Sequence, residues 1–352
     1  MLSNKTILIT GGTGSLGKVL TRRLLSGEVG TPKKIIIFSR DEAKQHAMRV
    51  EYMNKVHVTD EVIYHNFERL LTFQIGDVRD FHSVASAMRN VDVVFNTAAL
   101  KQVPTCEYFP YQAVMTNIEG PENIIRAIQE HELPVETVVG ISTDKACKPV
   151  NVMGMTKAIQ ERVFIQGNMR CPNTRIICVR YGNVLASRGS VIPFFHEQIK
   201  AGGPVTITTT DMTRFLLSLN QAVDTIFAAL REGKRGETFI PRVPSALITD
   251  LAEILIGDRP IKTIVTGVRP GEKIHEILIS EEECHRTIER GNYYAIMPIL
   301  PEVNLEKEFK PAISKEYSSD DDLMSREELQ KLLQDQKLMV DDEANQNGEL
   351  LR

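Results

Sequence analysis

An acid and a base stand side by side in the middle of the chain, at the end of a predicted buried strand. The apolar run 137–141 leads directly into Ser142-Thr143-Asp144-Lys145, and a second lysine, Lys157, follows twelve residues later on a predicted helix. Polar side chains at the carboxyl end of a parallel strand lie where doubly wound sheets bind their ligands. A carboxyl and an amine placed there could give and take protons in one reaction. The alternative is a solvated ion pair or a helix-capping turn, since adjacent Asp and Lys residues are mostly surface groups.

A second group of residues could hold phosphates near the N-terminus. Gly12-x-Gly14-x-x-Gly17 lies between an apolar run, 6–10, and a helical pattern, 18–25. Glycines allow a tight turn and close approach of a pyrophosphate, which the free amides of the helix N-terminus can bind. This context favours a dinucleotide site over a simple glycine-rich turn. The residues predicted to contact the cofactor here are Gly11, Thr13, Gly14, Ser15, Leu16 and Gly17.

The residues that follow the next predicted strand, 34–38, indicate which dinucleotide is bound. An acidic residue at this strand end receives a ribose 2′-hydroxyl, whereas an arginine accommodates a 2′-phosphate. Arg40, with Lys44 one helical turn on, therefore favours NADP over NAD. The alternative is a solvated arginine paired with Asp41 or Glu42.

Later strand ends complete the expected cofactor site. We expect Asp77 to accept from the adenine amino group and Val78 to cover the ring. The small Ala98 and Ala99 would let the dinucleotide lie close over the strand ends. The other residues predicted at the cofactor are Ser39, Lys101 (which could also reach the substrate), Asn117, Ser142, Thr143, Lys157 and Val184.

The order of these motifs predicts an α/β fold, a Rossmann-like doubly wound parallel sheet with a smaller C-terminal substrate-binding lobe. We expect a dinucleotide-binding domain over residues 1–182 and about 209–236, and the lobe over 183–208 and 237–335. Residues 336–352 are expected to form a disordered tail. The helical patterns 107–130 and 151–168 could form a dimer interface or pack inside the domain.

Composition narrows the possible partners. The net charge of −4 gives no reason to propose nucleic acid or an anionic membrane. Five scattered cysteines without a C-x-x-C pair argue against a disulfide framework or a zinc site and fit a reducing cytoplasm. No signal-peptide pattern and no apolar run of ~20 residues is present. We therefore expect a cytoplasmic protein that binds no metal.

Together the motifs resemble the extended short-chain dehydrogenase/reductases: Thr10-Gly11-x-x-Gly14-x-x-Gly17, Asp77-Val78 and Lys157. More narrowly, the chain resembles the inverting UDP-N-acetylglucosamine 4,6-dehydratases, the polysaccharide-biosynthesis branch of that superfamily. This narrower resemblance covers roughly the first 280 residues. It is carried by Phe38-Ser39-Arg40-Asp41-Glu42, Ala98-Ala99-Leu100-Lys101-Gln102-Val103-Pro104, Ser142-Thr143-Asp144-Lys145, Arg180-Tyr181-Gly182-Asn183-Val184, Ser187-Arg188-Gly189-Ser190-Val191-Ile192-Pro193, Met212-Thr213-Arg214-Phe215 and Arg269-Pro270-Gly271-Glu272-Lys273.

The resemblance implies a mechanism with transient oxidation at C4 of the sugar. A 4-ketone acidifies C5–H, so a base can remove that proton while an acid protonates the departing 6-hydroxyl. By resemblance, Lys145 is the C5 base, Asp144 the acid at O6, and Lys157 the ligand of the nicotinamide ribose. We expect burial, Lys157 and the nicotinamide to lower the pKa of Lys145. The resemblance also implies a homodimer or hexamer.

One position departs from the superfamily pattern. The usual motif is Tyr-x-x-x-Lys, but four residues before Lys157 stands Met153, whose thioether cannot transfer a proton. We expect Thr143, Ser142 or a water to hold O4 instead. The residues predicted to contact the UDP-sugar are Lys101, Met153, Asn183, Arg188, Gly189, Ser190, Val191, Pro193, Thr206, Arg214, Arg269 and Glu272. The arginines suit phosphates, although each could form a structural ion pair instead.

Two other functions are compatible with these motifs. A UDP-glucose or UDP-N-acetylglucosamine 4-epimerase would need no C5 base, so the Asp144–Lys145 pair speaks against it. A non-catalytic NADP-binding sensor is suggested by the missing tyrosine, but the substrate-loop motifs argue against that function.

Overall fold

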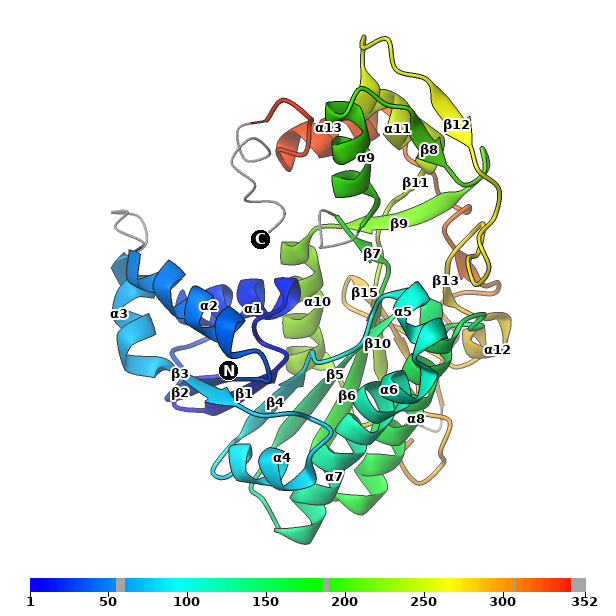
Figure 1. Ribbon diagram of the computed structural model, residues 1–352. Helices are drawn as coiled ribbons and strands as arrows, with labels where there is room; N and C mark the ends of the chain where they lie inside the picture. Colours follow the sequence, from blue (N-terminus) through cyan, green and yellow to red (C-terminus); the bar gives the residue numbers. More distant parts are fainter. Residues whose placement is uncertain (55–60, 186–189, 305, 307, 343–352) are drawn as a thin grey trace.

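A nine-stranded sheet runs through the centre of the computed structural model, which describes residues 1–54, 61–185, 190–304, 306 and 308–342 (Figure 1). Its strand order is β14-β15-β10-β6-β5-β4-β1-β2-β3. The section β3-β2-β1-β4-β5-β6 is the doubly wound order, which confirms the predicted fold class. The parallel strands are β1 (Thr6–Thr10), β2 (Lys34–Ser39), β3 (Leu71–Ile75), β4 (Val93–Asn96), β5 (Thr137–Thr143), β6 (Arg175–Tyr181) and β10 (Thr238–Pro241); β15 (Tyr293–Ile296) and β14 (Thr287–Arg290) are antiparallel.

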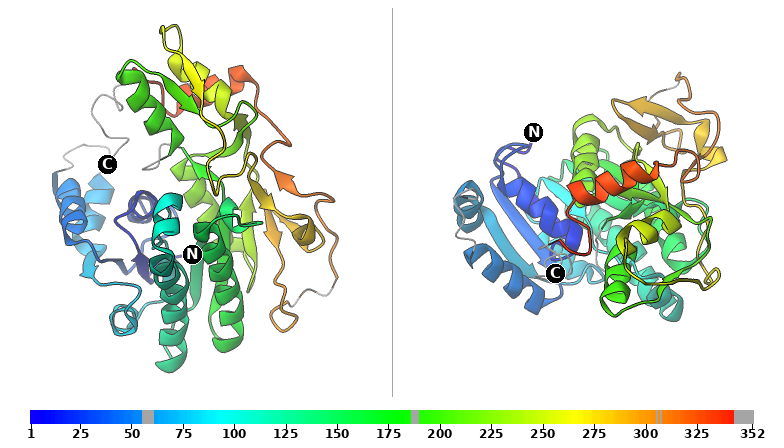
Figure 2. Two further views of the ribbon diagram at one scale, coloured as in Figure 1. Left: turned by 45° about the vertical axis from the view of Figure 1, so that its right-hand side comes forward. Right: turned by 90° about the horizontal axis from the view of Figure 1, so that it is seen from above.

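Helices cover both faces of this sheet, which explains why its central strands are continuous apolar runs (Figures 1 and 2). One face packs into a core with α1 (Ser15–Leu25), α2 (Glu42–Asn54), α3 (Glu61–Leu70) and α10 (Leu219–Glu232). The other face packs with α4 (Phe81–Ala87), α7 (Gly120–Glu130) and α8 (Val152–Arg170). The carboxyl ends of β1, β4 and β5 are thereby left between the two helix layers, where a ligand can reach them.

The helical pattern 107–130 is not one helix. It divides into α5 (Val103–Tyr108), α6 (Pro110–Val114), a π-helical turn η2 (Met115–Glu119) and α7. Pro110 and Pro121 explain the breaks, because proline has no N–H to donate and is tolerated only in a first turn. These helices pack against α8 within the chain. The homodimer or hexamer stays a prediction.

A smaller lobe follows β6 and is built from three small sheets. The first sheet contains β7 (Asn183–Val184), β9 (Thr213–Leu217) and β11 (Ser245–Leu247). The others pair β8 (Val205–Ile207) with β12 (Thr263–Val265), and β13 (Ile277–Ile279) with β16 (Tyr317–Ser318). Its helices are α9 (Val191–Lys200), α11 (Ile248–Ile256), α12 (Glu281–Cys284) and α13 (Arg326–Asp335). A separate apolar core holds α9, α11 and α13 together.

The predicted domain boundaries need two corrections. First, β10, β14 and β15 were assigned to the lobe, yet they extend the main sheet. Second, β9 was assigned to the dinucleotide-binding domain, yet it pairs with β7 and β11. The pairing partners of these strands are distant in the chain, so local sequence patterns do not reveal them.

The predicted tail, 336–352, begins too early. Leu338 and Val340 are buried in the core of the lobe, and Nε2 of His196 lies 3.0 Å from the Leu338 carbonyl oxygen. Residues 343–352 lie outside the described residues. Over the described ranges, no helix is long and apolar enough to cross a membrane.

Candidate active site

The glycine-rich loop after β1 is built for close contact. Gly11 has a φ of +66°, and a Cβ at this position would lie 2.8 Å from Cα of Ala98. At Gly17 a Cβ would lie 2.5 Å from Cα of Gly12. Only glycine fits either position, so the ends of β1 and β4 and the start of α1 lie close together.

The start of α1 suits a phosphate. Gly14 is its N-cap residue, no side chain caps it, and its first turn contains no acidic residue. The first amides of a helix point outwards and attract an anion. Thr13 is buried, whereas Ser15 and Leu16 are partly exposed at the same turn. These residues therefore fit the pyrophosphate of a dinucleotide.

The end of β2 presents one exposed cation. Arg40 is exposed, and its Nη1 lies 3.9 Å from Oδ2 of Asp77. The predicted pairing alternatives for Arg40 were Asp41 and Glu42. Asp41 instead pairs with Lys44, with 2.6 Å between its Oδ2 and the lysine Nζ.

Asp77 is itself engaged by a neighbour. Arg79 donates from Nε and Nη2 to its carboxylate at 2.9 and 2.6 Å. Burial raises the pKa of Asp77, but the bonds from Arg79 lower it by more, so the net shift is downwards. Ser39 is held by Gln45, which donates to its hydroxyl at 3.0 Å. The adenine contact predicted for Asp77 stays a prediction.

Val78 and Asn117, which were predicted to contact the cofactor, are both buried. Val78 is 6% exposed and packs beneath Gly120. Asn117 is fully buried, and its amide accepts from Leu100 N and donates to Leu100 O and Thr156 Oγ1. Asn117 therefore holds the loop after β4, and its contact with the cofactor stays a prediction. That loop also carries Ala98, Ala99 and the exposed Lys101.

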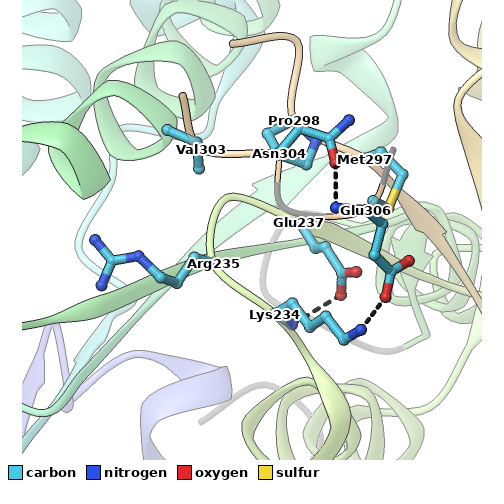
Figure 3. Close-up of a pocket in the computed structure, with 8 residues that line it drawn as sticks. All are labelled: Lys234, Arg235, Glu237, Met297, Pro298, Val303, Asn304 and Glu306. Carbon is cyan, nitrogen blue, oxygen red and sulfur yellow. Dashed lines mark hydrogen bonds and ion pairs between the residues drawn. The ribbon is translucent and has the colours of Figure 1, made fainter. Parts of the chain in front are cut away.

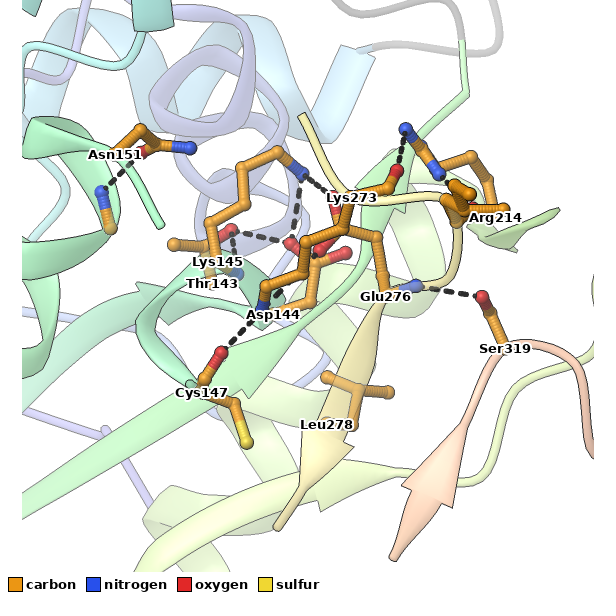
Figure 4. A network of polar contacts seen from close by, with 12 residues as sticks. Thr143, Asp144, Lys145, Cys147, Asn151, Arg214, Lys273, Glu276, Leu278 and Ser319 are labelled. Carbon is orange, nitrogen blue, oxygen red and sulfur yellow. Dashed lines mark hydrogen bonds and ion pairs between the residues drawn. The ribbon is translucent and has the colours of Figure 1, made fainter. Parts of the chain in front are cut away.

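The predicted acid and base lie at the end of β5, in the short 3-10 helix η3 (Asp144–Ala146) (Figure 4). Asp144 is fully buried, so the pair is not a solvated surface pair. Lys145 donates from Nζ to Asp144 Oδ1 at 3.0 Å. Thr143 donates to the same Oδ1 at 2.9 Å. The other carboxylate oxygen of Asp144 has no partner among the described residues.

The electrostatics of Lys145 differ from the prediction. Burial lowers its pKa, but the carboxylates of Asp144 and Glu276 raise it by more, so the net shift is upwards. The cation that opposes them is Arg214 rather than the predicted Lys157. The prediction of a lowered pKa was wrong because the sequence does not reveal a second carboxylate at 3.0 Å.

Lys157 and Met153 lie on the first turns of α8. Lys157 is buried and donates to the Ile141 carbonyl and to Gln160 Oε1, the latter at 2.6 Å. Two of its three donors are thus used, which leaves one for a ribose hydroxyl. Burial lowers its pKa to about 8 despite the nearby Glu161. Met153 is 4% exposed and packs with Cys106, so its side chain fills an apolar cluster.

Two hydroxyls remain near these groups as candidates for the sugar O4. Thr143 is partly exposed, whereas Ser142 is buried and its Oγ has no partner in the described part of the chain. Both stay predictions.

Glu276 and Lys273 are site residues that sequence reasoning missed. Glu276 is buried and forms an ion pair with Lys145. Lys273 donates to the Cys147 carbonyl at 2.5 Å, and its Nζ lies 4.0 Å from Glu276 Oε2. The available signal was the spacing of Glu276 three residues after the Arg-Pro-Gly-Glu-Lys motif and directly before an apolar strand.

The predicted substrate residues of the lobe fall into two groups. Asn183 joins the cluster, since its Oδ1 accepts from Lys145 Nζ at 3.1 Å. Arg214 is buried and donates to the carbonyls of Thr213, Ile274 and Lys273, so it holds the segment that carries Glu276. Arg214 is thus held by backbone carbonyls rather than by the ion pair named as its alternative, and its contact with the UDP-sugar stays a prediction.

The other group lies around α9 and β8. Thr206 is bonded to Gln198 of α9, and Glu272 accepts weakly from Thr208. Arg269 is exposed and 4.0 Å from Glu272. Ser190, Val191 and Pro193 form the start of α9, and Arg188 and Gly189 lie outside the described residues. Val184, which was predicted at the cofactor, lies in β7 and pairs with β9.

Comparison with known proteins places the chain in a family. A family model described as "Polysaccharide biosynthesis protein" matches residues 7–298. The chain belongs to this family. It is 43% identical over 344 residues to a Rickettsia conorii protein named UDP-glucose 4-epimerase, which covers 95% of this chain and 96% of that one. A Rickettsia prowazekii protein of the same name is 44% identical over 331 residues, 91% of this chain and 92% of that one.

Solved structures agree on the fold. The X-ray structure of Pen from Bacillus thuringiensis is 35% identical, with a TM-score of 0.84 over 96% of this chain and 100% of that one. DesIV, a dTDP-glucose 4,6-dehydratase from Streptomyces venezuelae, is 19% identical, with a TM-score of 0.63 over 76% of this chain and 86% of that one. The chain therefore shares the fold of both structures.

Proposed function

We propose that this protein catalyses the 4,6-dehydration of UDP-N-acetylglucosamine to a UDP-2-acetamido-2,6-dideoxy-4-keto-hexose, with inversion at C5. The observation that carries the proposal is the contact between two proton-carrying side chains at the end of β5, the buried Asp144 and Lys145. A dehydration across C5 and C6 needs one acid and one base. A 4-epimerisation needs no base at C5.

The raised pKa of Lys145 is compatible with this chemistry if the pair shares its proton. Transfer of one proton along the 3.0 Å contact from Lys145 Nζ to Asp144 produces a neutral amine and a carboxylic acid together. Lys145 then takes the C5 proton, and Asp144 gives its proton to O6, which leaves as water. The pair ends the step as ammonium and carboxylate, as it began.

The remaining residues orient the substrate and the cofactor. When bound, the dinucleotide would supply the hydride chemistry at C4 and C6 of the sugar. Thr143 would hold O4, and the support for this role is that its hydroxyl lies next to Asp144. Lys157 would hold the nicotinamide ribose through its remaining donor. Reprotonation of C5 from the opposite face would invert that centre.

We further propose NADP as the cofactor. The support is the exposed guanidinium of Arg40 at the end of β2, where a 2′-phosphate would lie. Distantly similar structures are described with NAD, among them DesIV at 19% identity, and this likeness concerns the fold alone.

A UDP-glucose 4-epimerase is the second candidate. The name of the Rickettsia relatives, which are 43–44% identical, favours it. The two functions differ in product mass, because dehydration releases water and epimerisation yields an isomer.

The deciding experiment incubates the protein with NADP⁺ and UDP-N-acetylglucosamine, and separately with UDP-glucose, in deuterium oxide. Mass spectrometry and NMR then analyse the nucleotide sugar. We expect loss of one water and deuterium at C5 from UDP-N-acetylglucosamine. An isomeric product of unchanged mass, without deuterium at C5, would replace our proposal with the epimerase.

A further inference from the structure

Glu276 brings a second carboxylate to the candidate site from a distant part of the chain. Its Oε1 lies 3.0 Å from Lys145 Nζ, and its side chain is only 3% exposed. It stands directly before β13 in the lobe, whereas Lys145 follows β5 in the main sheet (Figure 4). The lobe thus places a carboxylate beside the amine of Lys145, which belongs to the main domain.

The ammonium of Lys145 is held from three sides. It donates to Asp144 Oδ1 and Asn183 Oδ1, and it pairs with Glu276 Oε1. An ammonium has three donors, so these three oxygens fix the position of Nζ. The charged groups that face Lys145 are the carboxylates of Asp144 and Glu276 and the cations Arg214 and Lys273.

Glu276 is itself held firmly. Its backbone N–H donates to Ser319 Oγ at 2.9 Å, and its carbonyl accepts from Ser319 N at 2.8 Å. Lys145 at 3.0 Å is a closer cation than Lys273 at 4.0 Å. A buried carboxylate is costly unless it is paired, so a fixed backbone beside Lys145 keeps this charge where an ammonium needs it.

We propose that Glu276 is a positioning residue for the dehydration proposed above: it aims Lys145 at C5 and stabilises the ammonium formed there. The C5 proton moves to the lone pair of Lys145 Nζ, and the C5–H electron pair enters the conjugated 4-keto system. Glu276 stays ionised throughout. Its negative charge is adjacent to the positive charge that develops on Lys145, which lowers the barrier electrostatically.

This role predicts a specific change in pH dependence. C5–H exchange needs a neutral Lys145 but no acid at O6, so loss of the Lys145 proton to solvent raises the exchange rate with pH until the pKa of Lys145 is passed. Loss of the Glu276 charge lowers that pKa, because a carboxylate 3.0 Å from Nζ favours the charged ammonium. In a plot of exchange rate against pH, the part of the curve that rises (the rising limb) should therefore end at lower pH for Glu276→Gln than for the wild type. The plateau of the variant should also be lower, because the base is weaker and less well aimed.

The test measures C5–H exchange with deuterium between pH 6 and 10, using the holoenzyme and UDP-N-acetylglucosamine. We expect the wild-type rate to climb across the range and the Glu276→Gln rate to level off within it. A Glu276→Gln rate reduced by one factor at every pH, or not reduced, overturns the inference. If the glutamine variant does not fold, the Glu276→Asp variant tests the inference instead. Because aspartate keeps the charge on a shorter side chain, we expect a reduced exchange rate with an unmoved rising limb. An exchange rate equal to that of the wild type overturns the inference.

A matched control is available at the opposite end of the sheet. Glu237 is fully buried, pairs with Arg290 at 2.7 Å, and lines a small pocket with Lys234 and Met297 (Figure 3). Glu237→Gln also neutralises a buried carboxylate, so it should lower stability without moving the limb. A limb that moves in this variant as in Glu276→Gln overturns the inference.

The wild-type measurement separates this inference from the proposed function on which it rests. No water loss and no C5 exchange by the wild type overturns the proposed function, and the role of Glu276 with it. Wild-type exchange together with an unmoved Glu276→Gln limb overturns only the role of Glu276.

Discussion

Replacement of Glu283 by glutamine tests the buried ion cluster that joins α8, β6 and the C-terminal lobe. Arg180 at the end of β6 has a side chain 3% exposed. Its guanidinium pairs with Glu161 of α8 and with Glu283 of α12, each at 2.7 Å. The change leaves Arg180 with a single carboxylate partner and loosens the link between the helix that carries Lys157 and the lobe that carries Glu276.

The size of the effect follows from the pKa of Glu283. Burial raises this pKa, but the charge and hydrogen bonds of Arg180 lower it by more, from 4.5 to about 2. At ~1.4 kcal/mol per pH unit, this depression stabilises the folded protein by ~3 kcal/mol at pH 7. Removal of one partner from a buried pair typically costs about 3–5 kcal/mol, which agrees. We expect Glu283→Gln to lower the free energy of unfolding by ~3 kcal/mol.

The pH dependence has a definite sign. Because the folded pKa lies below the unfolded one, the stabilisation is present above pH 4.5 and is lost as the pH falls toward about 2. Urea denaturation at pH 7, 4 and 3, followed by circular dichroism, measures the difference between wild type and variant. That difference should be constant above pH ~5 and shrink below it.

An exposed pair supplies the control. Glu289 pairs with Arg242 while its side chain is 63% exposed, so Glu289→Gln should cost less than ~1 kcal/mol. A Glu283→Gln effect below ~1 kcal/mol at pH 7, or one that does not shrink between pH 5 and 3, would refute the reasoning.

Four further changes test the candidate site. Lys145→Ala should abolish C5–H exchange with deuterium oxide, as read by mass spectrometry; exchange at the wild-type rate would remove Lys145 from the mechanism. Met153→Tyr introduces a hydroxyl into an apolar cluster, so urea denaturation should show a loss of ~1–3 kcal/mol, with no gain in turnover. Arg40→Glu should weaken NADPH binding at least ~10-fold relative to NADH in a fluorescence titration, and an unchanged ratio would exclude its contact with a 2′-phosphate. Gly11→Ala brings a Cβ to 2.8 Å from Ala98 Cα at a positive φ, so cofactor binding should weaken ~10-fold or more and stability should fall by ~1–3 kcal/mol.

Local patterns in the sequence were sufficient to predict central strands of the main sheet and the glycine-rich turn. The strands at 6–10, 34–38 and 137–141 were readable because strands buried on both faces are continuous apolar runs. The glycine spacing after the first strand was readable because only glycine fits a turn this tight. Asp144 and Lys145 could be found because they follow a strand end directly.

Only the tertiary structure decided what surrounds these groups. Glu276 lies far from Lys145 in the chain, and the return of the lobe to the strand ends brings it within 3.0 Å. The upward pKa shift of Lys145 follows from that contact, because a pKa depends on the charges within a few ångströms. The same holds for β10, β14 and β15, whose place in the main sheet depends on pairing between distant segments. Sequence patterns report which face of a segment is buried, but they do not report which distant segment buries it.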